Sequence, residues 1–347
     1  MRRREGRARL IDRHCFSSED LPSTYHLAFS VKGEELAYRP GDSLSIYPKN
    51  REEDVEKTLQ ALCLRGREQV HFSPRGQGSR MLSLRELLKQ YVSLLHTPPS
   101  LLAGEKVESP LWHTLNSSLL QHHSLDEICS QFFSLRPRLY SISSSPQEHR
   151  REIHLLIAQK RWMYGGEEIR GVCSHYLTEE LPYEEEMQFS LHPTRSFLLP
   201  SPSIPIIMIG AGTGIAPYRS FMYQRRKEKG ANWLIFGTPH QKSHFYYRSF
   251  WETLNRSGKL KSSYAFSRDQ PEKRYVQHCI RKEEEEFWLW MKEGAVIYLC
   301  GDAKRMAREV EATLLTLICE RENCSTARSR EYLQALRRKR RYLLDVY

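Results

Sequence analysis

No apolar run in this 347-residue sequence approaches the roughly 18 residues that a membrane-spanning helix needs. The longest, SIPIIMIGAG, has the length of a buried strand and a turn. The basic start of the chain, MRRREGRAR, has no apolar segment after it, so a secretory signal is not expected. Together these absences predict a soluble, cytoplasmic protein.

Paired cysteines are missing as well. The eight cysteines form no CxxC pair and have no histidine partner at zinc spacing, which disfavours a disulfide framework, an iron–sulfur cluster and a zinc site. We therefore predict a reducing compartment and no metal site. The cysteines are Cys15, Cys63, Cys129, Cys173, Cys279, Cys300, Cys319 and Cys324.

The charge is mixed in sign, although the formal net charge is +11. The 42 acidic residues are interleaved with the basic ones, and the chain has no RRM signature, zinc-finger spacing or basic stripe with stacking aromatics. A nucleic-acid binder is therefore disfavoured. The basic excess suits an anionic small ligand or an acidic protein partner, and charge alone does not choose between them.

What is present is a succession of three patterns. Residues 20–48 alternate apolar and polar side chains between turn residues, which is typical of antiparallel strands. From about 50 to 130 the period is helical, as in EEDVEKTLQALCL, and short β segments return from 138 to about 199. After residue 200, short buried strands such as IPIIMIG, NWLIFG and AVIYLCG alternate with helices, which predicts a parallel sheet wound by crossovers.

A glycine turn follows the first strand of this α/β region. IIMIGAGTGIAP places Gly210, Gly212 and Gly214 between an apolar strand and a helix, where glycine lets backbone N–H groups approach a pyrophosphate. The spacing differs from G-x-G-x-x-G, and glycines at such junctions also serve packing alone. The turn by itself is weak evidence for a dinucleotide site.

Two later strand ends strengthen the interpretation. YAFSRDQPEKRYVQ puts hydroxyls and cations after a strand, which suits a phosphate monoester, although a solvated surface charge pair is the plainer alternative. IYLCGDAKRMA puts Cys300, Gly301 and Asp302 at a further strand end. Because the carboxyl ends of parallel strands share one edge of a sheet, we expect these sites to gather there. The hydroxyls and cations of the first group are Ser267, Arg268, Lys273 and Tyr275.

RLYSISSSP lies at the start of the returning β segments. Arg138 and Tyr140 share one face of the expected strand, with Ser141 on its other side or at a bend. A cation, an aromatic ring and a hydroxyl suit a phosphate with an attached ring system. In isolation these three residues would be unremarkable.

In combination the motifs resemble the ferredoxin-NADP⁺ reductase superfamily, and more narrowly the reductase half of diflavin enzymes such as NADPH-sulfite reductase flavoproteins and NADPH-cytochrome reductases. The resemblance runs from about residue 8 to the end of the chain, and eight motifs in family order are more specific than any one of them. They are YRPGDSLSIYP, RPRLYSISSSP, GVCSHYL, MIGAGTGIAPYRSFM, FGTPHQKSHFYY, AFSRDQPEKRYVQ, YLCGDAKRMAREV and RRYLLDVY.

The resemblance implies a fold class and three domains. An antiparallel β-barrel FAD-binding domain (1–49 and 131–200) would be split by a helical connecting insert (50–130). A doubly wound α/β NADP-binding domain (201–347) would follow it.

The resemblance also implies two cofactors, FAD and NADPH, and a role for each matching residue. The FAD ligands would be Arg138, Tyr140, Ser141, Gly171, Val172, Cys173 and Ser174. The NADPH pyrophosphate would lie on Gly212, Thr213 and Gly214, and its 2′-phosphate on Ser267, Arg268, Lys273 and Tyr275, with Gln277 nearby. The polar set around the hydride path would be Ser141, Cys300 and Asp345, with Asp302 also in the cofactor site.

The last residue, Tyr347, would lie flat on the flavin ring and act as a gate, anchored through the helix before it. Stacking contributes about 0.5–1.5 kcal/mol beyond area burial, which is enough to hold the ring and small enough for NADPH to displace it.

Diflavin enzymes also carry an FMN domain, whereas only a few dozen residues precede YRPGD here. We therefore expect that domain to be absent and the electron acceptor to be a separate flavodoxin, ferredoxin or sulfite-reductase-like haemoprotein. The function expected is an FAD-dependent NADPH reductase that resembles sulfite reductase flavoproteins. The alternatives are an NADPH-flavodoxin or ferredoxin reductase, and a non-catalytic relic that keeps the fold as a binding subunit.

Overall fold

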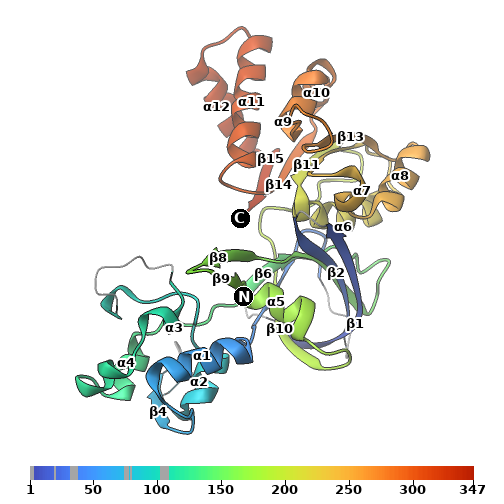
Figure 1. Ribbon diagram of the computed structural model, residues 1–347. Helices are drawn as coiled ribbons and strands as arrows, with labels where there is room; N and C mark the ends of the chain where they lie inside the picture. The colour runs from blue at the N-terminus through green and yellow to red at the C-terminus, as the bar shows by residue number, and fades with distance from the viewer. Residues whose placement is uncertain (1–3, 19–20, 32–37, 74–77, 79, 102–108) are drawn as a thin grey trace. The chain divides into compact units, whose positions relative to one another are not determined.

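The structure is a computed structural model that describes residues 4–18, 21–31, 38–73, 78, 80–101 and 109–347 (Figure 1). The chain divides into two compact units. The first comprises Met1–Leu44, Tyr140–Ala158 and Tyr183–Tyr347, and the second comprises Ser45–Leu139 and Gln159–Pro182. None of the described helices is both long enough and apolar enough to span a bilayer.

An antiparallel sheet of six strands forms the flavin-type part of the fold. Its order is β6-β3-β10-β1-β2-β7. A bridge between Ile142, just after β6, and Leu155 of β7 joins its two edges, and Ser143 N donates to His154 O at 2.8 Å beside it. The sheet therefore curls toward the barrel predicted from the sequence. The strands are β1 (Arg4–Ser18), β2 (Leu21–Val31), β3 (Ser43–Ile46), β6 (Arg138–Ser141), β7 (Glu152–Ala158) and β10 (Glu186–His192).

The second unit is mainly helical around its own apolar core, in which Val55, Leu59 and Leu87 are fully or almost fully buried. Its helix α4 begins at a capping box, in which Ser124 and Glu127 satisfy each other's backbone N–H groups. The helices expected within 50–130 are therefore present. The elements are α1 (Glu52–Leu62), β4 (Gln69–Phe72), β5 (Arg80–Ser83), α2 (Leu84–Gln90), η1 (Pro99–Leu101), α3 (Leu111–Thr114), η2 (Ser117–Gln121), α4 (Leu125–Gln131), β8 (Arg161–Tyr164), β9 (Glu167–Arg170), α5 (Val172–His175) and the π-helical turn η3 (Tyr176–Glu180).

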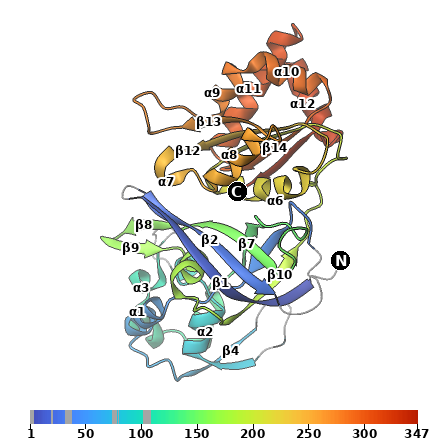
Figure 2. The same ribbon diagram turned by 90° about the vertical axis from the view of Figure 1, so that its right-hand side faces the viewer.

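A parallel sheet of order β13-β12-β11-β14-β15 forms the rest of the first unit. Its central strands are apolar on both sides, and each face has its own core, covered by a separate set of helices that can be followed in Figure 2. Helices α6 and α8 pack on one face, and α9 to α12 pack on the other. The elements are β11 (Ile206–Ala211), η4 (Gly212–Ile215), α6 (Ala216–Arg225), β12 (Asn232–Thr238), α7 (Gln241–His244), α8 (Arg248–Arg256), β13 (Lys261–Phe266), α9 (Val276–Lys282), α10 (Glu284–Lys292), β14 (Val296–Gly301), α11 (Met306–Arg321), α12 (Thr326–Arg338) and β15 (Tyr342–Val346).

These two sheets confirm the predicted fold class, and three elements differ from expectation. The basic N-terminal segment is strand β1, and residues 172–180 are helical within a region expected to be β. The C-terminal tail is strand β15, which pairs with β14 and follows the helix α12, so it is a strand rather than an unpaired tail. Part of the strand region expected over 20–48, residues 32–37, lies outside the described residues.

The compact units do not coincide with the three domains expected from the sequence, because direct contacts join α6 to the segment after β6 and to β7. The division at 50, 130 and 200 stays a prediction.

Candidate functional site

Three of the predicted hydride-path residues meet at the carboxyl edge of the parallel sheet. Strands β14 and β15 pair with Cys300 opposite Asp345. Ser141 Oγ donates a 2.9 Å hydrogen bond to Asp345 Oδ2, and Cys300 Sγ lies 3.9 Å from the same oxygen. A residue of the barrel strand β6 is thus joined to the end of the α/β sheet.

Burial sets the protonation of this cluster. It raises the pKa of Asp345, while the hydrogen bonds from Ser141 and Cys300 act in the opposite direction. It also raises the pKa of the fully buried Cys300 thiol, and the neighbouring carboxylate adds to that effect. Cys300 is therefore a protonated thiol at neutral pH, and Ser141 holds its hydroxyl proton toward Asp345.

The glycine turn lies directly beside this cluster. A Cβ on Gly214 would overlap the Cys300 carbonyl oxygen, and one on Gly210 would lie 2.8 Å from the Tyr218 ring. Gly212 instead has a φ of +56° and nothing within 4 Å of its Cβ position. Gly210 and Gly214 therefore serve close packing of the turn, whereas Gly212 faces open space.

Tyr347 extends β15 past the cluster and over the turn. Its N–H donates to Gly301 O at 3.1 Å, its carbonyl accepts from Ala303 N at 3.1 Å, and its hydroxyl bonds Thr213 Oγ1 at 2.7 Å. The residue is nevertheless 65% exposed. The ring is held in place by backbone and hydroxyl contacts while much of its surface remains open.

The predicted phosphate-binding residues follow β13. Ser267 and Arg268 are set by backbone bonds to Thr238 O and Pro239 O, at 3.0 and 2.9 Å. In the described part of the chain, Arg268 and Lys273 have no carboxylate within ion-pair distance. These exposed cations are free to bind a phosphate.

Tyr275, 41% exposed, caps α9 beside them. The buried Gln277 bonds Glu309 and leaves its Oε1 without a partner.

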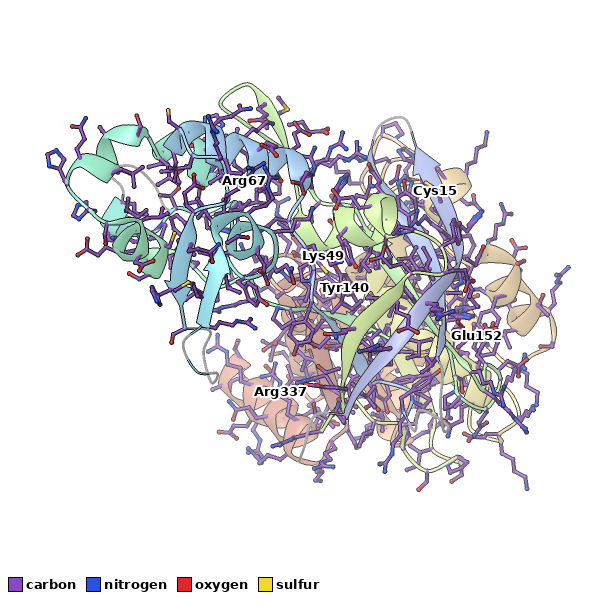
Figure 3. All side chains as sticks on the ribbon, turned by 90° about the horizontal axis from the view of Figure 1, so that it is seen from below. Cys15, Lys49, Arg67, Tyr140, Glu152 and Arg337 are labelled. Carbon is purple, nitrogen blue, oxygen red and sulfur yellow. The ribbon has the colours of Figure 1, made fainter. Side chains whose placement is uncertain are left out.

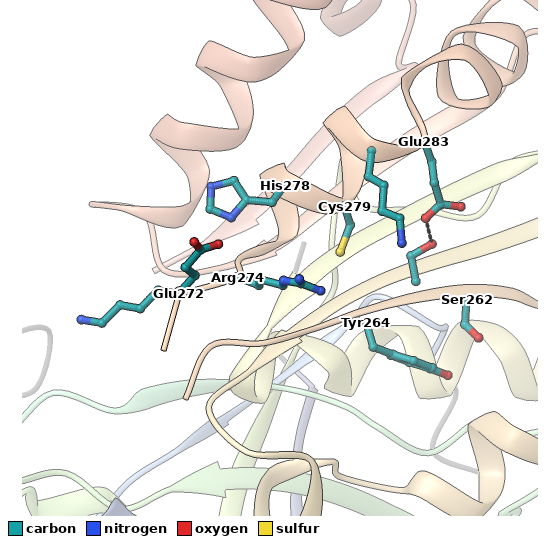
Figure 4. A pocket seen from close by; sticks show the side chains of 10 residues that line it. Ser262, Tyr264, Glu272, Arg274, His278, Cys279 and Glu283 are labelled. Atoms are coloured by element: carbon teal, nitrogen blue, oxygen red, sulfur yellow. Dashed lines mark hydrogen bonds between the residues drawn. The ribbon is translucent and has the colours of Figure 1, made fainter. Parts of the chain in front are cut away.

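A pocket of about 660 Å³ borders this region (Figure 4). Lys273, Arg274 and Lys282 line it together with Glu272, and none of the three cations has a carboxylate within ion-pair distance among the described residues. Glu283, also in the lining, accepts from Ser263 Oγ at 2.6 Å. The pocket extends the cationic surface beyond Lys273.

The predicted FAD pyrophosphate residues Gly171 to Ser174 lie at the start of α5. Gly171 N already donates to Lys160 O at 2.8 Å, and Ser174 Oγ donates to Gly171 O at 3.0 Å. The Gly171 N–H is therefore engaged within the protein, and the role of this segment as a pyrophosphate site stays a prediction.

Three other predicted residues have different surroundings. On β6, Arg138 is exposed and Tyr140, which is labelled in Figure 3, is half-buried. Asp302 uses Oδ1 to accept from the backbone N–H groups of Arg305, at 2.6 Å, and Met306. It thereby caps the start of α11.

Sequence reasoning missed Arg219 and His154. Arg219 NH1 donates to Ser143 O at 3.1 Å and to His154 Nδ1 at 3.3 Å. The sequence carried one signal for Arg219, since it is a cation within the mostly apolar segment APYRSFMYQR. Tyr218, Phe221 and Met222 around it are fully buried, so little of this helix is exposed to solvent.

These features fit the two implied cofactors. An open, left-handed glycine at the end of β11 and, among the described residues, exposed cations without a carboxylate partner after β13 suit the phosphates of a dinucleotide. The exposed ring of Tyr347, fixed through Thr213 and Gly301, suits a flat partner such as a flavin. The fold is that of a flavin- and nicotinamide-dependent oxidoreductase.

The chain matches the family described as FAD binding domain over residues 8–109 and 106–176, and that described as Oxidoreductase NAD-binding domain over 208–312. It belongs to the ferredoxin-NADP⁺ reductase superfamily, in its diflavin reductase branch. The matches confirm FAD and a nicotinamide dinucleotide as its cofactors.

The relatives that it resembles are named sulfite reductase [NADPH] flavoprotein alpha-component. The chain is 37% identical to the one from Photorhabdus laumondii, with 93% of the chain and 57% of the relative aligned. It is 35% identical to the one from Mannheimia succiniciproducens, with 98% of the chain and 60% of the relative aligned. It is also 35% identical to the one from Sodalis glossinidius, with 95% of the chain and 58% of the relative aligned. The chain thus spans less than two thirds of the length of these relatives.

Proposed function

We propose that this chain oxidises NADPH with bound FAD and passes the electrons to a separate protein acceptor, as a sulfite reductase flavoprotein-like reductase. The observation that carries the proposal is the cluster of Ser141, Cys300 and Asp345 beside the glycine turn. When bound, FAD supplies the hydride acceptor and one-electron carrier that no side chain provides.

The chain's own residues would bind the two cofactors and orient them toward each other. Arg138, Tyr140 and the segment Gly171–Ser174 would hold the flavin, and the turn at Gly212 would hold the dinucleotide. The protonated Cys300 thiol presents no negative charge to a nicotinamide, and Asp345 Oδ2 fixes the hydroxyl of Ser141. Such positioning supplies much of the rate in a reaction between two bound partners.

A preference for NADPH over NADH would come from the cations after β13. We expect Arg268→Ala to remove most of it, because a guanidinium fork binds a phosphate in two places. The measurement is the ratio of kcat/KM for NADPH and NADH with an artificial acceptor. Arg248→Ala, in an exposed ion pair with Glu252, is the matched control. An unchanged ratio in Arg268→Ala would contradict the assigned clamp.

The acceptor is proposed to be a haemoprotein, flavodoxin or ferredoxin on a separate chain. The support for a haemoprotein is the name of the relatives, which assigns them to sulfite reductase. A non-catalytic relic is disfavoured because Ser141, Cys300 and Asp345 remain in contact. A purified chain that takes up no FAD would favour the relic instead.

A further inference from the structure

Helix α6 connects the dinucleotide turn to the flavin strand. It follows η4 without a break, so its first turn moves with Gly212–Ile215. One turn later, Arg219 NH1 donates to Ser143 O at 3.1 Å and Ser220 Oγ donates to Ser144 O at 2.5 Å. These carbonyls lie two and three residues after Ser141. A single helix therefore contacts both sides of the expected hydride path.

Arg219 is an unusual residue for this position. It is only 9% exposed, and no carboxylate lies within ion-pair distance of it in the described ranges. Its guanidinium lies 4.5 Å from the Tyr247 ring centroid and 4.9 Å from that of Tyr223, and NH2 donates to Tyr223 OH at 2.9 Å. Aromatic faces and neutral acceptors compensate the buried charge.

Strand β7 fixes the same segment from the other side. His154 N donates to Ser144 Oγ at 2.9 Å, and its carbonyl accepts from Ser143 N at 2.8 Å. The His154 ring accepts from Arg219 at Nδ1, so its proton is on Nε2, which donates to Glu152 Oε2 at 2.8 Å (Glu152 is labelled in Figure 3). Glu152, His154 and Arg219 thus form one chain of hydrogen bonds that ends on the Ser143 carbonyl.

We propose that Arg219 is a positioning residue for hydride transfer, because it holds the Ser141–Ser144 segment and the Gly212–Ile215 turn in one fixed arrangement. The inference rests on the proposed function. A planar fork that reaches Ser143 O, His154 and Tyr223 at once cannot be replaced by an apolar side chain or by a single ammonium. The reaction depends steeply on the alignment of the two reacting rings.

The test compares Arg219→Gln and Arg219→Lys with Arg226→Gln. Arg226 is the matched control, because it bonds Glu148 at 2.6 Å on the surface and also ties α6 to the segment before β7. At saturating NADPH, we expect Arg219→Gln to reduce the flavin about 10–100-fold more slowly, as a displacement of about 1 Å would. The rate of flavin reduction in Arg219→Lys should lie between that of Arg219→Gln and that of the unaltered chain. FAD content and the Kd for NADP⁺ should stay within about twofold, since neither cofactor contacts Arg219 in this assignment.

A second readout needs no activity. Amide exchange of Ile142 and Ser143, whose N–H groups bond Asp42 O at 3.0 Å and His154 O at 2.8 Å, should accelerate in Arg219→Gln without added cofactor. It should not accelerate in Arg226→Gln. Unchanged exchange in Arg219→Gln overturns the proposal, and so does an equal loss of rate in Arg226→Gln.

The two proposals fail in distinguishable ways. If NADPH does not reduce the flavin of the unaltered chain, the proposed function fails and the hydride role of Arg219 falls with it. If the unaltered chain is reduced and Arg219→Gln is reduced equally fast, the positioning role alone is overturned.

Discussion

At the scale of single residues, the carboxylate of Asp345 is the feature with the clearest energetic cost. It is partly buried, and its hydrogen-bond partners are a hydroxyl and a thiol rather than a cation. Burial raises its pKa, so the folded state disfavours its charged form. A folded-state pKa above the unfolded value means that Asp345 costs stability at neutral pH and that the cost falls as acid protonates it.

We therefore expect Asp345→Asn to stabilise the protein and to slow it. At pH 7 the melting temperature should rise by about 2–4 °C, which corresponds to about 1 kcal/mol. The advantage should shrink as the pH falls through the raised pKa of Asp345. Flavin reduction by NADPH should slow, because the carboxylate no longer fixes Ser141. Calorimetry and stopped-flow absorbance measure the two effects, with the exposed Glu285→Gln as control. A less stable variant at pH 7 would contradict this account.

The family resemblance placed Ser141, Cys300 and Asp345 in one polar set, and the structure brings the three side chains together, whereas their role around a hydride path stays a prediction. The sequence did not predict Arg219 or His154. Their roles depend on which residues of β7 and α6 face each other, and strand and helix periodicity within one segment carries no such information. The placement of Gly171 in the flavin site stays a prediction, and its N–H is engaged with Lys160.

At the scale of elements, the junction of β11, η4 and β14 is the most tightly constrained part of the α/β sheet. A Cβ at Gly214 would overlap the backbone of Cys300, whereas a Cβ at Gly212 would have no atom within 4 Å. Glycines in one turn are thus required for two different reasons, steric in one case and conformational in the other.

This difference predicts unequal costs for alanine. Gly214→Ala should lower the free energy of unfolding by more than about 2 kcal/mol, because its Cβ overlaps a backbone oxygen. Gly212→Ala should cost only about 1–2 kcal/mol for the left-handed conformation. It should weaken NADP⁺ binding instead, since its Cβ points into open space. Urea unfolding and a titration with NADP⁺ compare the two variants. Equal losses of stability would show that the packing at Gly214 relaxes.

Elements were predicted best where the apolar pattern was strong. The five-residue tail strand β15 was not predicted, because the tail was expected to be anchored through the helix before it and its pairing with β14 is a long-range contact. Strand β1 was missed because its apolar residues, such as Ala8 and Leu10, are few among arginines and other polar side chains. Helix α5 was missed because four residues are too short for a helical period.

At the scale of the whole molecule, buried histidines link stability to pH. His26 and His154 pack edge to face at 4.9 Å between β2 and β7, and burial lowers the pKa of each to about 3. Below pH 6.5 these histidines bind protons in the unfolded chain, whereas in the folded chain they stay neutral until the pH approaches 3. Stability is therefore lost as the pH falls toward 3.

His154→Gln should remove its share of this dependence. Below pH 6.5, the stability of the unaltered protein should fall relative to the variant by up to about 1.4 kcal/mol per pH unit. Asp54, whose pKa burial raises to about 6, acts in the opposite direction but cancels in the comparison. Urea unfolding between pH 7 and 4.5 measures the slope, with the exposed His71→Gln as control. Parallel curves for His154→Gln and the unaltered chain would rule out a neutral buried His154.

The cations follow β13, which is an outer strand of the parallel sheet and pairs with β12. Cys300 on β14 and Asp345 on β15 lie two and three strands beyond β12. In the proposed assignment, recognition of the coenzyme's 2′-phosphate and the hydride chemistry at its nicotinamide thus belong to separate strands of one sheet. Evolution or an engineer can exchange one dinucleotide for another at the rim and leave the reacting centre untouched.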